Sequence, residues 1–157
     1  MVKLKKCILF DLDQTLVDSS RSEYNRKQGN WHLVYQEICR FHRYPGVRKT
    51  IQDLKSAGWK VGIVTSSPRK YAEKVVKQFD LKCDTLICFH DTYLNKPNPD
   101  PYVKALKAMK VKRAFAFAVG DTQDDIDAAN ELGIISIWAR WGINESYPDV
   151  KNYDSSF

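Results

Sequence analysis

Short apolar runs alternate with longer segments of helical periodicity along most of this chain. Runs at 7–10, 60–64, 84–88, 114–119 and 134–138 have the length and character of buried strands. Between them, apolar residues recur every three or four positions, as on the inner face of an amphipathic helix. Strands that alternate with helices predict a parallel sheet built of right-handed β-α-β units. The predicted fold class is therefore α/β.

The helical segments are delimited by proline, glycine and the spacing of apolar residues. The stretch 18–29 is polar and is expected to be loop or frayed helix, and the tail after Trp141 carries no clear final helix. The predicted helices cover 31–44, 46–57 with Gly58 as the stop, a segment after Pro68 bearing Tyr71, Val75 and Phe79, one bearing Tyr102, Leu106 and Met109, and one bearing Ile126, Ala129 and Leu132.

Length and composition favour a single soluble domain, 1–157. Lys and Arg outnumber Asp and Glu by 25 to 19, which suits an anionic partner, although such an excess taken alone more often reflects a solvated surface. The four cysteines lack Cys-x-x-Cys spacing, so reduced thiols are expected. The first apolar run meets Asp11 after four residues, too soon for a signal peptide or a membrane span. We expect a cytoplasmic protein with no membrane partner.

Polar side chains follow several of the predicted strands. Those that stand at strand ends or in the following loops are Asp11 and Asp13, Thr65 and Ser66, Lys96, and Asp121 with Asp125. In isolation, each signal is commonly a turn, a helix cap or a solvated lysine. The carboxyl ends of parallel strands share one edge of a sheet, so these groups are expected to converge. Converged, they form a phosphate site with a hard-cation site beside it.

The residue types suit phosphoryl chemistry. A phosphate dianion repels a carboxylate nucleophile unless a cation cancels charge, and the carboxylate oxygens of Asp11 and Asp121 suit Mg²⁺. An aspartate can then form an acyl phosphate, while Asp13 donates and later accepts a proton. Thr65 and Ser66, expected at a helix start, would offer hydroxyl and N–H donors to phosphate oxygens. Lys96 would offset the charge that spreads over the transferring group.

The ordered set resembles the four motifs of the haloacid dehalogenase superfamily. The matching segments are Asp11-Leu12-Asp13-Gln14-Thr15, Val64-Thr65-Ser66-Ser67, Lys96-Pro97-Asn98-Pro99 with Tyr102, and Gly120-Asp121 with Asp125. The resemblance covers the chain from Cys7 to about Trp141. It implies a Rossmann-like three-layer sandwich with a mostly parallel central sheet and a short helical cap insertion.

The resemblance also implies roles for single residues. Asp11 would be the nucleophile and Asp13 the general acid and base. Thr65, Ser66 and Lys96 would bind the phosphate. Mg²⁺ would be held by Asp121, by the Asp11 carboxylate and by the Asp13 backbone carbonyl, with Asp125 ligating or orienting it; Asp124 has no clear role. An aspartate at the second acidic position, where this chain has Asp13, resembles the pattern of phosphatases and phosphomutases and not that of the dehalogenases.

Two features depart from the family pattern. Gln14 stands where many relatives have glycine. The cap insertion, at about 19–44, has room for only one or two helices, so the site is expected to be open. An open site favours a bulky phosphorylated substrate, such as a phosphoprotein, a nucleic-acid end or a large metabolite, or a lid supplied by a second subunit. Basic residues in this segment would suit a polyanion, but such residues more often form a solvated helix face: Arg21, Arg26, Lys27, Arg40 and Arg43.

The leading hypothesis is a Mg²⁺-dependent phosphatase, a phosphoric monoester hydrolase that works through an aspartyl-phosphate. The alternatives are a catalytically idle binding or regulatory module on the same fold, and a phosphomutase. The complete set of acids argues against the idle module. The chain has no G-x-x-x-x-G-K-[ST] loop, which argues against phosphoryl transfer from a nucleotide. The segment 121–125 lacks the glycine and the glutamate that a calcium-binding loop requires.

Overall fold

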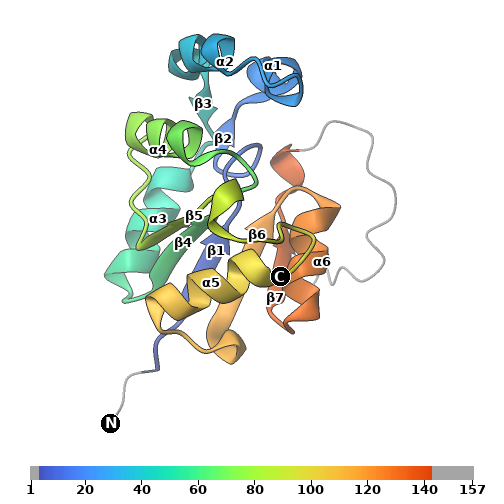
Figure 1. Ribbon diagram of the computed structural model, residues 1–157. Helices are drawn as coiled ribbons and strands as arrows, with labels where there is room; N and C mark the ends of the chain where they lie inside the picture. Colours follow the sequence, from blue (N-terminus) through green and yellow to red (C-terminus); the bar gives the residue numbers. More distant parts are fainter. Residues whose placement is uncertain (1–3, 143–157) are drawn as a thin grey trace.

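The computed structural model describes residues 4–142 and is organised around one parallel sheet (Figure 1). Its strands lie in the order β5-β4-β1-β6-β7, and every neighbouring pair is parallel. The strand bounds are β1 Cys7–Phe10, β4 Lys60–Val64, β5 Thr85–Ile87, β6 Ala116–Gly120 and β7 Ile135–Trp138. The central strand β1 is fully buried, as its unbroken apolar sequence predicts.

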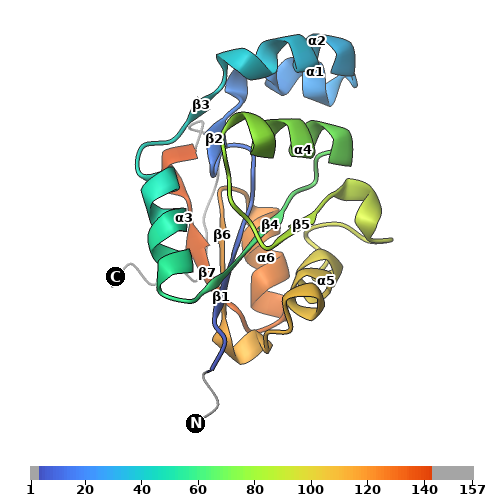
Figure 2. The same ribbon diagram turned by 90° about the vertical axis from the view of Figure 1, so that its left-hand side faces the viewer.

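Helices cover both faces of the sheet. The four long helices are α3 Val47–Ser56, α4 Arg69–Gln78, α5 Asp100–Met109 and α6 Gln123–Glu131. On β1, Ile8 and Phe10 belong to the core beneath α3 and α4, whereas Cys7 and Leu9 belong to the core beneath α5 and α6. Figure 2 shows the sheet between α3 on one side and α5 and α6 on the other. The predicted three-layer α/β sandwich is confirmed.

The strand order reverses direction at β1. The chain passes from β1 to β4 and β5 on one side, then crosses back to β6 and β7 on the other. Such a reversal opens a crevice outside the carboxyl ends of the strands, which is where open α/β sheets bind ligands. The predicted site residues follow β1, β4, β5 and β6, so the topology brings them to this crevice.

A small cap, defined as residues 19–41, stands above the carboxyl edge of the sheet (Figure 1). It begins after β2 Val17–Asp18 and ends before β3 His42–Arg43, and these two strands pair antiparallel. Its elements are η1 Ser20–Ser22, α1 Glu23–Lys27, α2 Trp31–Glu37 and η2 Ile38–Arg40. Val34, Ile38 and Phe41 join the main core beside Tyr71. The segment lies inside the expected insertion of about 19–44, and a division of the chain into domains stays a prediction.

The predicted helix over 31–44 is wrong in its second half. The α-helix ends at Glu37, continues as 3-10 helix to Arg40, and gives way to extended chain at Phe41 (φ −72°, ψ 164°). The helical spacing of apolar residues is real, but pairing of β3 with β2 requires extended backbone, and this long-range pairing overrides the local pattern. Phe41 is still buried, although it reaches the core from extended chain.

Other boundaries differ by one or two residues. The strand expected over 114–119 begins at Ala116, because Arg113–Phe115 forms a 3-10 turn, and that expected over 84–88 covers Thr85–Ile87. Pro68 is the N-cap of α4, which begins directly after it. All four cysteines are free, as predicted. The prediction for the tail falls largely on 143–157, outside the described residues. Within 4–142, no helix has both the length and the apolar character needed to cross a membrane.

Candidate active site

A pocket of about 780 Å³ lies at the carboxyl edge of the sheet, beneath the cap. The side chains predicted for the site all line it: Asp11, Asp13, Thr65, Ser66, Lys96, Asp121 and Asp125. They follow four different strands, so their meeting depends on the parallel topology and not on closeness in the sequence. The cap contributes further lining residues, among them Arg26 and Trp31.

Three buried carboxylates form the floor of the pocket. Asp11, Asp121 and Asp125 each offer one oxygen, and these oxygens lie within 4.8 Å of one another. Burial raises the pKa of Asp11 well above its ordinary value, and the charges of Asp125 and Asp121 raise it further, whereas Lys96 lowers it. Burial followed by the charge of Asp125 raises the pKa of Asp121 to about 6. Three acids this close are stable as anions only when positive charge stands among them.

Lys96 supplies one such charge. Its side chain is 4% exposed, and its ammonium nitrogen lies 2.8 Å from Asp11 Oδ1 and 2.5 Å from Asp125 Oδ1. It also donates to the Val64 carbonyl at 3.0 Å. Burial disfavours the charged ammonium, but the carboxylates of Asp11 and Asp125 outweigh it and raise the pKa of Lys96. The solvated lysine expected for an isolated Lys-Pro pair is therefore excluded at this position.

Asp125 is held by the first turn of α6. Thr122 is the N-cap, and the two residues form a capping box in which Asp125 Oδ2 accepts from the Thr122 N–H and hydroxyl. The other oxygen, Oδ1, faces Lys96. Gly120 makes the arrangement possible, since a Cβ at that position would lie 2.3 Å from Asp125 Cγ. Asp125 thus caps the start of α6 with one carboxylate oxygen and contacts Lys96 in the pocket with the other.

Asp121 is fixed by contacts that the sequence pattern did not single out. Its Oδ1 accepts from the Thr15 hydroxyl at 3.0 Å, and its backbone carbonyl accepts from the Trp138 indole N–H at 3.2 Å. The Trp141 indole donates to the Thr15 carbonyl at 3.0 Å. Thr15 lies in the first motif, but nothing in the spacing of the two tryptophans predicts that Trp138 contacts Asp121 or that Trp141 contacts Thr15.

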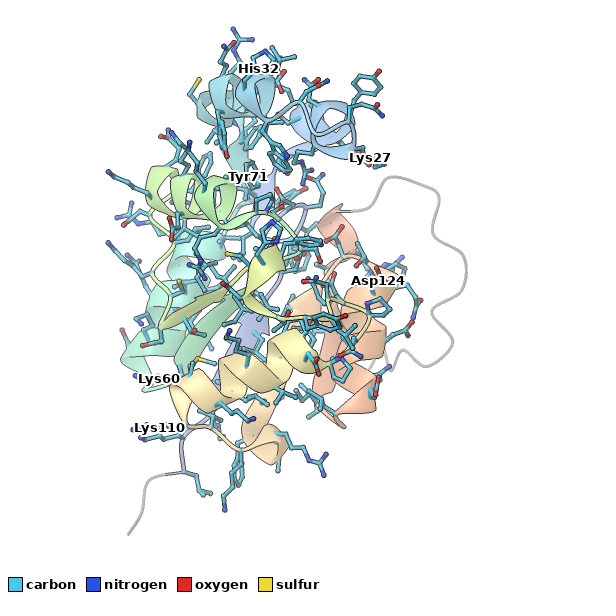
Figure 3. The ribbon with its side chains drawn as sticks, viewed as in Figure 1. Lys27, His32, Lys60, Tyr71, Lys110 and Asp124 are labelled. Carbon is cyan, nitrogen blue, oxygen red and sulfur yellow. The ribbon has the colours of Figure 1, made fainter. Side chains whose placement is uncertain are left out.

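Asp13 is surrounded by donors. Its Oδ1 accepts from the hydroxyls of Ser19 (2.6 Å) and Tyr71 (2.5 Å). Its Oδ2 accepts from the Ser67 hydroxyl at 2.8 Å and lies 3.1 Å from Arg26 Nη1. Helical spacing had assigned Tyr71 to the core alone, yet its buried ring carries a hydroxyl that reaches the site from beneath the cap (Figure 3).

Gln14 adopts a left-handed backbone, with φ of +62°. This conformation favours glycine, the residue that the family pattern leads us to expect at the position. The glutamine side chain offsets the strain by accepting a hydrogen bond from the Ser19 backbone N–H at 2.8 Å. The departure from the family pattern therefore preserves the turn after Asp11.

Thr65 and Ser66 do not start a helix, contrary to the prediction, because α4 begins at Arg69. Thr65 is buried, its hydroxyl oxygen accepts from the Ser67 N–H at 3.1 Å, and its own N–H donates to the Ile87 carbonyl at 2.9 Å. That N–H is not available to a phosphate. The Thr65 hydroxyl proton and the exposed Ser66 remain the groups that face the pocket.

The buried acids fit a divalent cation. Their donors are carboxylate oxygens, which Mg²⁺ prefers over nitrogen or sulfur. Burial, and after it the charges of the neighbouring acids, raises the pKa of Asp11 and Asp121, and a bound cation would oppose both effects. Asp13 turns its carboxylate toward the hydroxyls and Arg26. Any share of Asp13 in holding a metal would therefore fall to its backbone carbonyl.

Comparison with known proteins adds independent evidence. A family model for haloacid dehalogenase-like hydrolases matches residues 22–139. A protein of Caldanaerobacter subterraneus subsp. tengcongensis, provisionally named pyrophosphatase PpaX, is 36% identical over 123 residues, which are 77% of this chain and 52% of that one. A phosphoglycolate phosphatase of Aquifex aeolicus is 30% identical over 143 residues, covering 88% of this chain and 67% of that one.

A crystal structure of a HAD phosphatase from Thermococcus onnurineus has the same fold, with a TM-score of 0.77 at 22% identity, covering 96% of this chain and 91% of that one. The chain spans about half to two thirds of the length of the two curated relatives. The family match covers most of the chain and includes three of the four motifs that meet in the pocket. The chain therefore belongs to the haloacid dehalogenase-like hydrolase family.

Proposed function

We propose that the chain is a Mg²⁺-dependent phosphatase that hydrolyses a phosphate monoester through an aspartyl-phosphate on Asp11. The observation that carries the proposal is the contact of Asp11 Oδ1 with Lys96, 2.8 Å away, inside a cluster of buried acids. A lysine held in this way offsets charge on both the nucleophile and an incoming phosphate. Mg²⁺, held by Asp11, Asp121 and Asp125, would neutralise further charge on the phosphate oxygens.

The reaction proceeds in two steps. The Asp11 carboxylate attacks phosphorus, so a new O–P bond forms as the bond to the leaving alcohol oxygen breaks, and Asp13 protonates that oxygen. Water then attacks the phosphorus of the aspartyl-phosphate, Asp13 takes the water proton, and the Asp11 carboxylate is regenerated. The hydroxyls of Ser19, Ser67 and Tyr71 fix the Asp13 carboxylate for both transfers. Thr65, Ser66 and Lys96 bind the phosphate oxygens.

The names of the relatives favour a small phosphorylated substrate for this chain as well. One relative is named as a pyrophosphatase and the other as a phosphoglycolate phosphatase. Arg26 and Trp31 of the cap line the same pocket as Asp11, so the short insertion reaches the site despite its length. The bulky substrate, the lid from a second subunit and the phosphomutase and idle-module alternatives stay predictions to be tested beside this one.

The decisive experiment compares wild type with Asp11→Asn on p-nitrophenyl phosphate, with Mg²⁺ and with EDTA. We expect Mg²⁺-dependent release of p-nitrophenol that falls by about 10³-fold or more in the variant, because the amide keeps the shape but not the nucleophile. Asp127→Asn, an exposed carboxylate on α6, is the matched control and should retain wild-type activity. Near-wild-type turnover in Asp11→Asn would contradict the assignment of the nucleophile. A wild type that is silent on every phosphate ester would favour the idle module.

A further inference from the structure

One cap arginine behaves differently from the other basic residues around it. The Arg26 side chain on α1 is only 16% exposed, whereas Arg21 and Lys27 of the same cap are exposed. Its guanidinium enters the pocket, lies 3.1 Å from Asp13 Oδ2, and stands over the Tyr71 ring at 6.0 Å from the centroid. The solvated helix face expected for the basic residues of this segment therefore does not describe Arg26.

The Arg26 guanidinium is not fully satisfied. Its Nε is buried and has no hydrogen-bond partner among residues 4–142. A buried N–H donor without an acceptor is uncommon in folded proteins, and it calls for an explanation. The Nε–H and a neighbouring N–H of a guanidinium form a planar fork that matches the two oxygens of a carboxylate or a phosphate. A pocket-lining arginine with a free donor is thus suited to an anion.

Asp13 does not depend on Arg26 to be satisfied. Its two oxygens already accept from three hydroxyls, those of Ser19, Ser67 and Tyr71. The guanidinium can therefore move toward a ligand without leaving a bare carboxylate behind. The pocket volume of about 780 Å³ falls in the range of small-molecule sites, so it holds more than the phosphoryl group at Asp11.

We propose that Arg26 binds a second anionic group of the substrate, a carboxylate or a second phosphate, at the cap side of the pocket. The inference rests on the proposed function, in which the transferred phosphate lies against Asp11 with its oxygens bound by Thr65, Ser66 and Lys96. It makes Arg26 a specificity-determining residue, because substrates with only one anionic group cannot use the fork. The preferred substrates are then phosphate esters or anhydrides that carry their second charge a few bonds from the phosphorus.

The test uses phosphonates that cannot be hydrolysed, titrated calorimetrically into the full chain with excess Mg²⁺. Ethylphosphonate carries one anionic group, 3-phosphonopropionate adds a carboxylate, and methylenediphosphonate adds a second phosphonate. The variants are Arg26→Gln, Arg26→Lys and, as the matched cap control, Arg21→Gln, which lies outside the pocket. Circular dichroism and thermal melts establish that each variant is folded before it is titrated.

We expect Arg26→Gln to weaken at least one of the two doubly anionic ligands tenfold or more, while ethylphosphonate changes less than threefold. Arg26→Lys should fall in between, since it keeps the charge but loses the fork. Arg21→Gln should match wild type. The ligand that depends on Arg26 identifies the second group as a carboxylate, a phosphate or either.

Equal weakening of all three phosphonates would assign Arg26 to the support of Asp13, and no weakening of any would leave it without a binding role; either result overturns the inference. The same holds if wild type binds neither doubly anionic ligand more tightly than ethylphosphonate. Failure of the proposed function looks different. In that case the Arg26-dependent binding persists while wild type hydrolyses no phosphate ester.

Discussion

At the scale of single residues, Asp13 and its donors distinguish this site from a simple cluster of acids. Three hydroxyls and one guanidinium point at one carboxylate, and Tyr71, which is fully buried, belongs to them. Burial and the Asp13 charge raise the pKa of the Tyr71 hydroxyl far above its ordinary value. Tyr71 is thus a donor to Asp13 throughout the accessible pH range, and its role is to position that carboxylate.

Tyr71→Phe is expected to lower kcat about tenfold while KM stays within twofold. The ring still fills its place in the core, but Asp13 Oδ1 keeps only the Ser19 donor and rotates more freely. The loss is a fraction of the roughly 10²–10⁴-fold that general acid–base catalysis contributes. Steady-state kinetics on p-nitrophenyl phosphate measure it, with Tyr35→Phe on the cap as control. A drop in thermal stability without a drop in kcat would give Tyr71 a purely structural role.

Residue identity and local pattern were enough to predict which strand-end side chains meet in the pocket. Asp11, Lys96 and Asp121 stand out because each follows a strand that is apolar enough to recognise. Ser19, Tyr71 and Arg26 were not assigned to the site because their contacts with Asp13 depend on how the cap and α4 fold over the sheet. Tyr71 also satisfies the helical spacing of a core residue, and spacing does not show where a hydroxyl points.

At the scale of elements, the start of α6 joins a helix cap to the acid cluster. Gly120 ends β6 and allows Asp125 to fold back within the capping box. The sequence signalled both the strand end and the helix start. It did not signal that the glycine is required by a side chain five positions later, because that requirement is a close approach in space.

Gly120→Ala is expected to displace Asp125 and to abolish most Mg²⁺-dependent turnover. An added Cβ would lie 2.3 Å from Asp125 Cβ, so the capping box must open. Overpacking of this kind costs about 1–3 kcal/mol of unfolding free energy. Urea unfolding and Mg²⁺ titration of activity measure the two effects. Gly133→Ala, at the other end of α6, is the control, because its added Cβ meets nothing within 4 Å and only its φ of +66° is strained. Its Mg²⁺ response should be unchanged.

The cap shows where prediction from local pattern fails. The helical spacing of apolar residues that begins at Trp31 continues past the true end of the helix. Phe41 fits this spacing and is buried, but its backbone is extended. A two-residue strand such as β3 leaves almost no periodicity of its own. It is determined by its partner β2, which lies 24 positions earlier by the pairing of Asp18 with His42 and 26 by that of Val17 with Arg43.

At the scale of the whole molecule, the buried acids couple stability to pH and to metal. The pKa of Asp121 is about 6 in the folded chain against an ordinary 3.8, so between these values the folded state holds a proton that the unfolded state releases. The contribution of Asp121 to the free energy of unfolding therefore decreases as the pH rises from 3.8 to about 6, and it does not recover at higher pH. At about 1.4 kcal/mol for each pH unit, the loss approaches about 3 kcal/mol.

We expect Asp121→Asn to be more stable than wild type in EDTA above about pH 6, and the difference to vanish near pH 4. Saturating Mg²⁺ should stabilise wild type at pH 7.5 and leave the variant unchanged, because binding to the folded state alone adds stability. Denaturant unfolding at several pH values, with and without Mg²⁺, measures both. A difference between the two proteins that does not vary with pH would contradict the assignment of the shift to Asp121.

The pairing of Val17 with Arg43 and of Asp18 with His42 places the two ends of the cap side by side on the core. Residues 19–41 are thus a cassette, which leaves and re-enters the core at one spot. A segment of another length can be grafted between these two strands without altering the order of the five strands beneath it. The proposed contact of Arg26 with the substrate thus lies in a stretch of chain short enough to exchange in a single cloning step, provided that the new segment keeps Ser19, whose hydroxyl holds Asp13.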